Sequence, residues 1–317
     1  MRESVNSFFE HGLVWAGLGA LLVVCLVTGV LLSTQRYRDR ITYAFMMRVG
    51  LQVGNDATFA AVQRRAFATA VAGIVGSTVA ILISAIVLFA NPQTNATNFL
   101  WIVVVPLALS LTVVGQMSVA LRETLFRQRA DSPRVARPRA TGLDDYISGW
   151  RRLIAPVLLA AAFLVNAVAV ILAWNGVIDA LAYVTSAALP LLVVGVVVFA
   201  AGIIADRLVL RTPQPATDPA ELAWSDAFIG DTLRNVRLAV GVVMWIAVAC
   251  GGVGILAGID AIDGTTWSTG VGLQLLTWGY IAVMLVFSTR GSQQYYLRRL
   301  WPQVLEASPR TEPVAQA

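Results

Sequence analysis

The sequence predicts an all-α, polytopic integral membrane protein with seven transmembrane helices, built from parallel two-helix repeats. The 317-residue chain is 57% hydrophobic and only 13% charged, which is too apolar for a soluble chain of this length. It contains seven apolar runs, each with the roughly 20 residues that cross a bilayer core. Its arginines gather in alternate connections, as the positive-inside rule requires of segments on one side of a membrane.

The apolar runs define the expected spans in order along the chain. They occupy residues 11–33, 68–90, 99–120, 153–174, 182–205, 238–259 and 267–288. The first run is longer than a signal-peptide core and ends without a small-residue cleavage pattern, so we expect it to be retained. Arg36, Arg38 and Arg40 follow it directly. The N-terminus is therefore expected outside and this end of the first helix inside.

The charge of the connections supports this threading. The predicted outer segments are 1–10, 91–98, 175–181 and 260–266, and Arg2 is the single arginine within them. All 23 basic residues are arginine, which suggests a GC-rich genome and excludes a retinal Schiff base on lysine. We expect N-out, C-in, a membrane domain over 1–290, a partly disordered cytoplasmic tail over 291–317, and location in a bacterial cytoplasmic membrane.

The segments expected on the inner side differ in character. Residues 41–53 are apolar but too short to span, so we expect them at the inner membrane interface. The connection 122–152 is strongly basic and contains Pro133 and Pro138, which predicts an extended, mobile segment. A short helix is expected over 293–305.

A charged lead-in precedes three of the apolar runs. An aspartate and an arginine eight positions apart recur as Asp56 and Arg64, Asp144 and Arg152, and Asp226 and Arg234. This recurrence, with Pro106 and Pro190 at matching places in two later runs, predicts parallel repeats of about 80 residues related by an axis along the membrane normal.

The simplest interpretation of the lead-ins is structural, because aspartate caps helices and arginine anchors them at headgroups. The alternative is a shared cytoplasmic interaction surface, in which the six charged residues form a ring around an inner mouth. Eight helical residues rise about 12 Å. We therefore expect that the acid and the arginine of one lead-in do not pair directly, and that a salt bridge would have to join two repeats.

Catalytic and metal-binding motifs are absent from the sequence. His11 is the single histidine, so a His-Glu-x-x-His zinc site or a Ser–His pair cannot be built within the chain. Asp260 and Asp263 are too few for a cation site, and a solvated turn is the favoured interpretation. The sequence therefore predicts no enzyme activity, no cofactor and no metal.

Two further patterns concern the interior of the predicted spans. Gln116, Asn166 and Gln274 are neutral polar residues at depth. Such residues usually form interhelical hydrogen bonds, and the alternative is that they line a transport path. Gly254 and Gly258 are four positions apart, which predicts close packing against another helix.

Three functional hypotheses follow. The favoured one is a non-catalytic membrane subunit or scaffold whose arginine-rich cytoplasmic face binds a protein partner and anionic headgroups; no nucleic acid is expected. The alternative is a small-molecule or ion transporter with a path between the repeats, in which Pro106 and Pro190 break helices. The third is a lipid-modifying enzyme using Asp56, Asp144, Asp145 or Asp226, although no nucleophile or metal set accompanies these residues.

Overall fold

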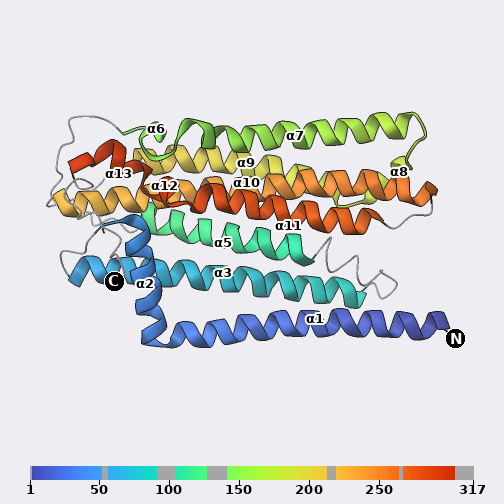
Figure 1. The fold of residues 1–317 in the computed structure, drawn as a ribbon, viewed down its shortest axis with the longest axis horizontal. Helices are drawn as coiled ribbons and strands as arrows, with labels where there is room; N and C mark the ends of the chain where they lie inside the picture. The colour runs from blue at the N-terminus through green and yellow to red at the C-terminus, as the bar shows by residue number, and fades with distance from the viewer. Residues whose placement is uncertain are drawn as a thin grey trace, which may run out of the picture.

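The computed structural model describes residues 2–51, 56–90, 104–126, 141–212, 219–263 and 267–303. The regular elements within these ranges are all helices, as the sequence predicts. Long helices lie side by side along one axis, and several short helices gather at one end (Figure 1). The long helices are α1 (Arg2–Ser33), α3 (Asp56–Ala90), α5 (Val105–Phe126), α7 (Gly149–Trp174), α9 (Ala188–Arg211), α10 (Pro219–Asp263) and α11 (Trp267–Ser288). The short helices are α2 (Gln35–Val49), α6 (Leu143–Tyr146), α8 (Ala180–Thr185), α12 (Arg290–Gln293) and α13 (Tyr295–Leu300).

Six of the described helices are long and apolar enough to cross a membrane, namely α1, α3, α5, α7, α9 and α10. Helix α11 coincides with the seventh predicted span, and its apolar stretch Gln274–Ser288 is shorter than the others. Large apolar side chains such as Val30, Phe89 and Trp174 face outward and are exposed, which suits contact with lipid tails rather than water. The fold is that of a multi-pass membrane protein. Seven spans, the N-out orientation and the parallel repeats stay predictions.

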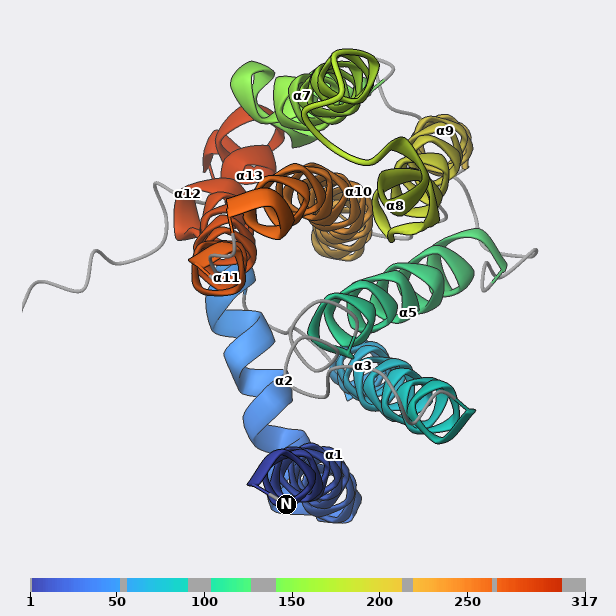
Figure 2. The same cartoon turned by 90° about the vertical axis from the view of Figure 1, so that its right-hand side faces the viewer.

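Helix α10 lies at the centre of the bundle (Figure 2), where it contacts α5, α7, α9 and α11. Its middle is buried on every side by these neighbours. The buried residues of the stretch 238–250 are apolar: Leu238, Ala239, Val240, Val242, Val243, Met244, Ile246, Ala247, Ala249 and Cys250. A helix that is apolar all round belongs in a core rather than at a surface.

Helix α1 lies at the edge of the bundle (Figure 2) and packs on α3 and α2. It buries Val14 and Leu18 in a small cluster with Ile81 and Leu88 of α3. Most of its other apolar side chains are exposed, so lipid tails would cover them.

The short helices α2, α6, α12 and α13 gather at the end of the bundle where α1, α5, α9 and α11 finish (Figure 1). We call this the arginine-rich end, because the arginines of α2, α9 and α13 lie there. An apolar cluster fills it, which we call the cap core. Its buried members are Phe45, Val49, Leu51, Val62, Tyr146, Ile147, Val209, Ala223, Trp224, Ala227, Ile229, Leu233, Tyr296 and Leu297.

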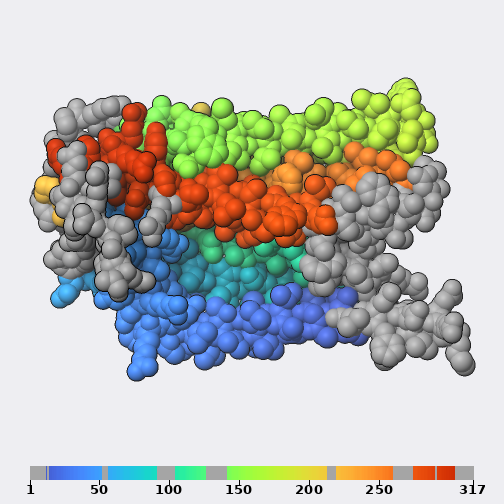
Figure 3. All heavy atoms as spheres, viewed as in Figure 1, coloured from blue at the N-terminus to red at the C-terminus, as the bar shows by residue number. Residues whose placement is uncertain are grey.

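Two predicted connections are therefore folded in part. Helix α6 lies within the basic connection predicted to be mobile, and residues 127–140 of that connection lie outside the described residues. The predicted helix over 293–305 is two short helices, α12 and α13. Tyr296 and Leu297 of α13 are buried in the cap core, while 304–317 lies outside the described residues. Figure 3 shows α12–α13 and α2 together at this end.

Helix α2 covers most of the segment 41–53 that was predicted at the inner membrane interface, and residues 52 and 53 of that segment lie outside the described residues. It turns across the end of α1 (Figure 1) and buries Thr42, Phe45 and Val49. Tyr43 and Met47, one turn apart, stay exposed. The helix ends at Gly50, whose φ of 77° is in the left-handed region that glycine adopts most easily.

The two prolines expected to break helices lie near the starts of two helices. Pro106 is the second residue of α5, and Pro190 lies in the first turn of α9, directly after the break at residues 186–187. Proline is tolerated there because the first turn of a helix has no acceptor for its N–H groups. The predicted span 182–205 overlaps α9, and its first residues belong to α8, which ends at Thr185.

Helices α3 and α5 approach one another closely through small residues. A methyl group added at Gly76 would overlap the backbone carbonyl of Leu111, and one added at Gly115 would lie 2.8 Å from the carbonyl oxygen of Ala72. The hydroxyls of Ser77 and Thr112 share a hydrogen bond of 2.7 Å across the same contact. Small residues let two backbones approach in this way within a membrane.

Candidate functional site

A buried polar cluster lies under the cap core, where α3, α5 and α10 meet. Its centre is Arg65, which is only 4% exposed. The Arg65 Nη2 donates to Asp231 Oδ2 at 3.1 Å, to Thr232 Oγ1 at 2.7 Å and to the Phe228 carbonyl at 3.0 Å. Its Nη1 donates to Thr124 Oγ1 at 3.3 Å. One arginine thus joins three helices.

Asp231 is shared between several donors. Its Oδ1 pairs with Arg234 one turn later, and Asn235 Nδ2 donates to Oδ2, the oxygen that also accepts from Arg65, at 3.3 Å. Arg48 of α2 lies near this group: burial lowers the pKa of Arg48, and the charge of Arg234 lowers it further. Two guanidinium groups, those of Arg65 and Arg234, thus pair with the one carboxylate of Asp231, while the side chain of Arg48 is exposed nearby. Such a buried arrangement tolerates the loss of any one partner poorly.

A second polar contact ties α10 to the short helices. Asp226 is fully buried and accepts hydrogen bonds from Tyr146 Oη at 2.7 Å and from Trp301 Nε1 at 2.8 Å. Burial raises the pKa of the nearby Tyr296, and the negative charges of Asp226 and Asp231 act in the same direction. These bonds attach α6 and the residue after α13 to α10.

A third polar contact joins α9 to α10. Arg237 pairs with Asp206, and both side chains are largely buried. Asp206 Oδ1 and Arg237 Nε are buried without a hydrogen-bond partner. The pair is therefore incompletely satisfied, which is unusual for buried charge.

The three predicted lead-ins occupy three different environments. Asp56 is exposed at the first residue of α3, where a carboxylate favourably faces the free N–H groups of a helix start. Arg64 lies 3.9 Å from Glu123 of α5 and is half exposed. Asp226 is buried, as described, and Arg234 pairs with Asp231 rather than with Asp226. The described contacts do not join these residues into one ring.

The remaining lead-in corrects a prediction. Asp144 and Arg152 were expected not to pair directly, yet they form an ion pair. The expectation assumed one continuous helix. The chain instead leaves helical geometry at Ile147 and Ser148, both in extended conformation between α6 and α7. That break brings the two charged groups together.

The predicted path residues lie in separate contacts. Gln116 of α5 faces Gly73 of α3, where an added methyl group would lie 2.8 Å from Gln116 Nε2. Asn166 of α7 accepts a hydrogen bond of 2.9 Å from Tyr183 Oη of α8, and burial raises the pKa of Tyr183. Gln274 is exposed on α11. The described hydrogen bonds do not connect these three residues.

Gly254 and Gly258 of α10 make the predicted close contact, with a partner that was not expected. An added methyl group would lie 3.1 Å from the Tyr183 ring at Gly254 and 2.9 Å from Ile178 at Gly258. The partner is thus α8 and the turn before it. The side chains of His11, Asp260 and Asp263 lie outside the described residues. Among the described side chains, no group of three His, Cys, Asp or Glu is placed to hold a metal ion.

The sequence interpretation missed the residues that form the buried clusters. Arg65, Asp231, Asp206 and Arg237 do not share the repeated spacing on which that interpretation rested. The available signal was local: Asp231 and Arg234 are three positions apart and therefore lie on one helix face.

Comparisons with protein-family models, with curated proteins and with solved structures give no match for this chain. Its own geometry describes a multi-pass helical bundle whose charged contacts are concentrated at one end.

Proposed function

We propose that this chain is a non-catalytic membrane subunit or scaffold that binds a protein partner at its arginine-rich end, and that this end faces the cytoplasm. The observation that carries the proposal is the folded state of that end. Segments of six helices, α2, α3, α6, α9, α10 and α13, build the cap core there. Hydrogen bonds and an ion pair to Asp226 and Asp231 attach it to α10. A bundle that only needed loops between its spans would not require such a layer.

The surface of this layer is suited to an acidic partner. Arg298 and Arg299 of α13, Arg122 of α5 and Arg211 of α9 are exposed around it. A surface of one charge steers an oppositely charged partner to it and helps to select that partner.

The centre of the bundle favours association over transport. The position that a path between repeats would occupy is filled by the apolar middle of α10. Two of the three candidate path residues, Gln116 and Asn166, are used in contacts between helices. One observation favours the transport alternative: the pairs Arg65–Asp231 and Asp206–Arg237 are buried charges, and such groups in membrane proteins often mark ion or substrate pathways.

Site-specific photo-crosslinking in cells tests the proposal. A photoreactive residue at Ala220 or Arg299, both exposed at the arginine-rich end, should give a discrete protein adduct. The same residue at Trp174 or Leu181, exposed at the opposite end, should not. Arg298→Glu should weaken the adduct formed at Ala220. Equal labelling at both ends, or no adduct at the arginine-rich end, would contradict the proposal.

The orientation has its own test. Reporter fusions after Asp179 and Asp263 should score extracytoplasmic, and fusions after Arg137 and Thr217 should score cytoplasmic. A reversal at either pair would place the arginine-rich end outside and remove the proposed docking surface from the cytoplasm.

A further inference from the structure

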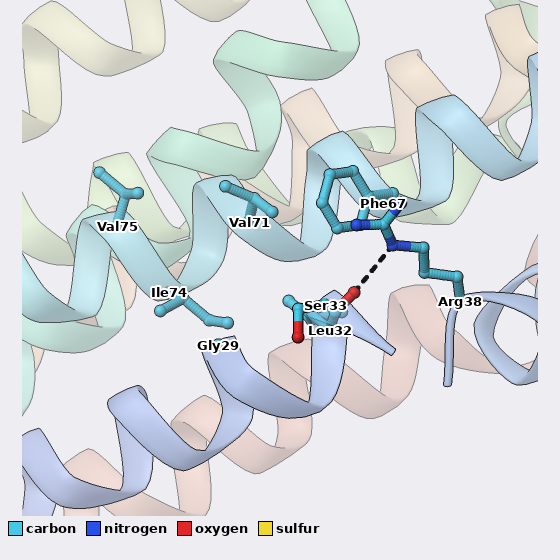
Figure 4. A pocket seen from close by; sticks show the side chains of 8 residues that line it. All are labelled: Gly29, Leu32, Ser33, Arg38, Phe67, Val71, Ile74 and Val75. Carbon is cyan, nitrogen blue, oxygen red and sulfur yellow. Dashed lines mark hydrogen bonds between the residues drawn. The ribbon is translucent and has the colours of Figure 1, made fainter. Parts of the chain in front are cut away.

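A hollow of about 250 Å³ opens between α1 and α3, beside the start of α2 (Figure 4). Its walls are apolar along most of their length, with Gly29 and Leu32 on α1 facing Val71 and Ile74 on α3. Arg38 of α2 lies at one end, next to Phe67 of α3. The hollow is therefore an apolar groove with the cationic guanidinium of Arg38 at one end.

The guanidinium of Arg38 is held in place by two contacts. Its Nε donates to the Leu32 carbonyl at 2.9 Å, and its central carbon lies 4.3 Å from the centre of the Phe67 ring. Within the part of the chain that the structure describes, these are the contacts of this side chain, so Nη1 and Nη2 stay available to an anion. The neighbouring carboxylate, Asp39, accepts from Gln35 and Gln63 instead.

The hollow lies beside the end of the apolar run of α1. Helix α1 ends its apolar run at Ser33, and α2 turns across the end of the bundle from Gln35. Arg38 therefore lies where a helix passes from the hydrocarbon core to the headgroup layer. The apolar walls line the last turn of α1, from Gly29 to Ser33, and the exposed Val27 and Val30 lie on the same part of that helix.

We propose that this hollow binds one anionic phospholipid, with its phosphate on Arg38 and an acyl chain along Val71 and Ile74. The preference for an anionic headgroup follows from the positive charge around the hollow. Arg36 and Arg40 are exposed on the same helix and add to the positive potential around the mouth, which favours an anionic over a zwitterionic lipid. The proposal concerns a different surface from the protein-docking end and stands independently of it.

Native mass spectrometry of the full chain measures this binding directly. The purified protein is exchanged into micelles containing phosphatidylglycerol or phosphatidylcholine, and the lipid retained on the monomer is measured. We expect phosphatidylglycerol to be retained preferentially. Arg38→Gln should weaken its binding about fivefold, the effect of one arginine near an anionic headgroup.

Arg40→Gln is the matched control, since it removes the same charge from the same helix at an exposed position outside the hollow. It should leave retention nearly unchanged. Gly29→Leu fills the hollow without touching a charge; an added methyl group at Gly29 meets nothing within 4 Å, so the helix accommodates it. This variant should reduce retention of both lipids.

Equal losses in Arg38→Gln and Arg40→Gln would show that only surface charge attracts the lipid, which overturns the proposal. Unchanged retention in Gly29→Leu would overturn it as well. Gly29→Leu leaves all charges in place, so it tests the proposal even if Arg38→Gln misfolds. The Tm of each variant, measured in the same micelles, shows whether that variant is folded.

Discussion

The arginine-rich end and the apolar part of the bundle hold their helices together by different means. At the arginine-rich end, Arg65, Asp231 and Asp226 form long-range hydrogen bonds that join elements far apart in the sequence. In the apolar part, α3 and α5 meet through Gly76 and Gly115, where the absence of a side chain lets the backbones touch. Polar contacts are specific but vulnerable to the loss of one partner. Glycine contacts are vulnerable to added volume.

The largest expected effect is at Asp231. Asp231→Ala leaves Arg65 buried without its anion, and breaking a buried pair costs about 3–5 kcal/mol. Unfolding in detergent, followed by Tm or by denaturant titration, measures the loss. The control is the double variant Arg65→Met with Asp231→Leu, which removes the most buried pair and should recover part of the stability, because Arg234 still loses its carboxylate. Exposed ion pairs contribute up to about 1 kcal/mol to the free energy of unfolding. A loss below that value in Asp231→Ala would mean that the polar contacts at the arginine-rich end are no more vulnerable than surface pairs.

Gly76→Leu probes the apolar part with the opposite kind of change. The new side chain would push against the Leu111 backbone, and overpacking of this type costs about 1–3 kcal/mol. Gly19→Leu is the control, because Gly19 of α1 is exposed and an added methyl group there meets nothing within 4 Å. Equal Tm values for the two variants would mean that α3 and α5 do not pack through this glycine.

A smaller loss is expected at the end opposite the arginines. Replacing Gly254 and Gly258 together with leucine would displace Tyr183 and Ile178. These side chains belong to a short helix and a turn that can shift, so we expect about 1 kcal/mol and a correspondingly lower Tm. Gly252→Leu is the matched control on the same helix, since an added methyl group there meets nothing within 4 Å. An unchanged Tm in the double variant would place that face of α10 toward lipid.

The smallest effect is expected at Arg152. Its pair with Asp144 is partly exposed, with 34% and 64% of the two side chains accessible. Exposed pairs contribute about 0.2–1 kcal/mol, and screening by salt lowers that further. Arg152→Gln should therefore change the Tm little, in contrast to a change at Asp231. A large loss of Tm would indicate that the break between α6 and α7 depends on this pair.

The long apolar helices were predictable, and the layer that caps them was not. Hydropathy identifies α7 and α9 because their side chains are apolar over a membrane length. Hydropathy assigns the residues of the cap core to the connections between the spans. These apolar residues are dispersed among arginines and form a core only when segments distant in the sequence pack together. Hydropathy also cannot separate Arg64 from Arg65. The two are adjacent in sequence but point about 100° apart around the helix. Arg64 is half exposed beside Glu123 of α5, and only Arg65 is buried between α5 and α10.

The three lead-ins also show that spacing in the sequence does not determine the environment of a residue. Identical spacing of Asp and Arg gave an exposed helix start at Asp56, a direct ion pair at Asp144 and a buried acceptor at Asp226. The spacing is a property of the sequence, whereas each environment depends on what packs against it. A break of two residues before α7 was enough to reverse the expected geometry.

The length of α10 has a structural consequence. Its 45 residues form one helix of about 68 Å, roughly twice the 30 Å of a bilayer's hydrocarbon core. Its single proline, Pro219, is at the first position, where it does not interrupt the helix. One end carries Asp226 and the cap, and the other carries the contact with α8. The same continuous helix that packs on α8 at one end therefore reaches beyond the thickness of a hydrocarbon core, and its other end anchors the cap through Asp226 without any intervening loop.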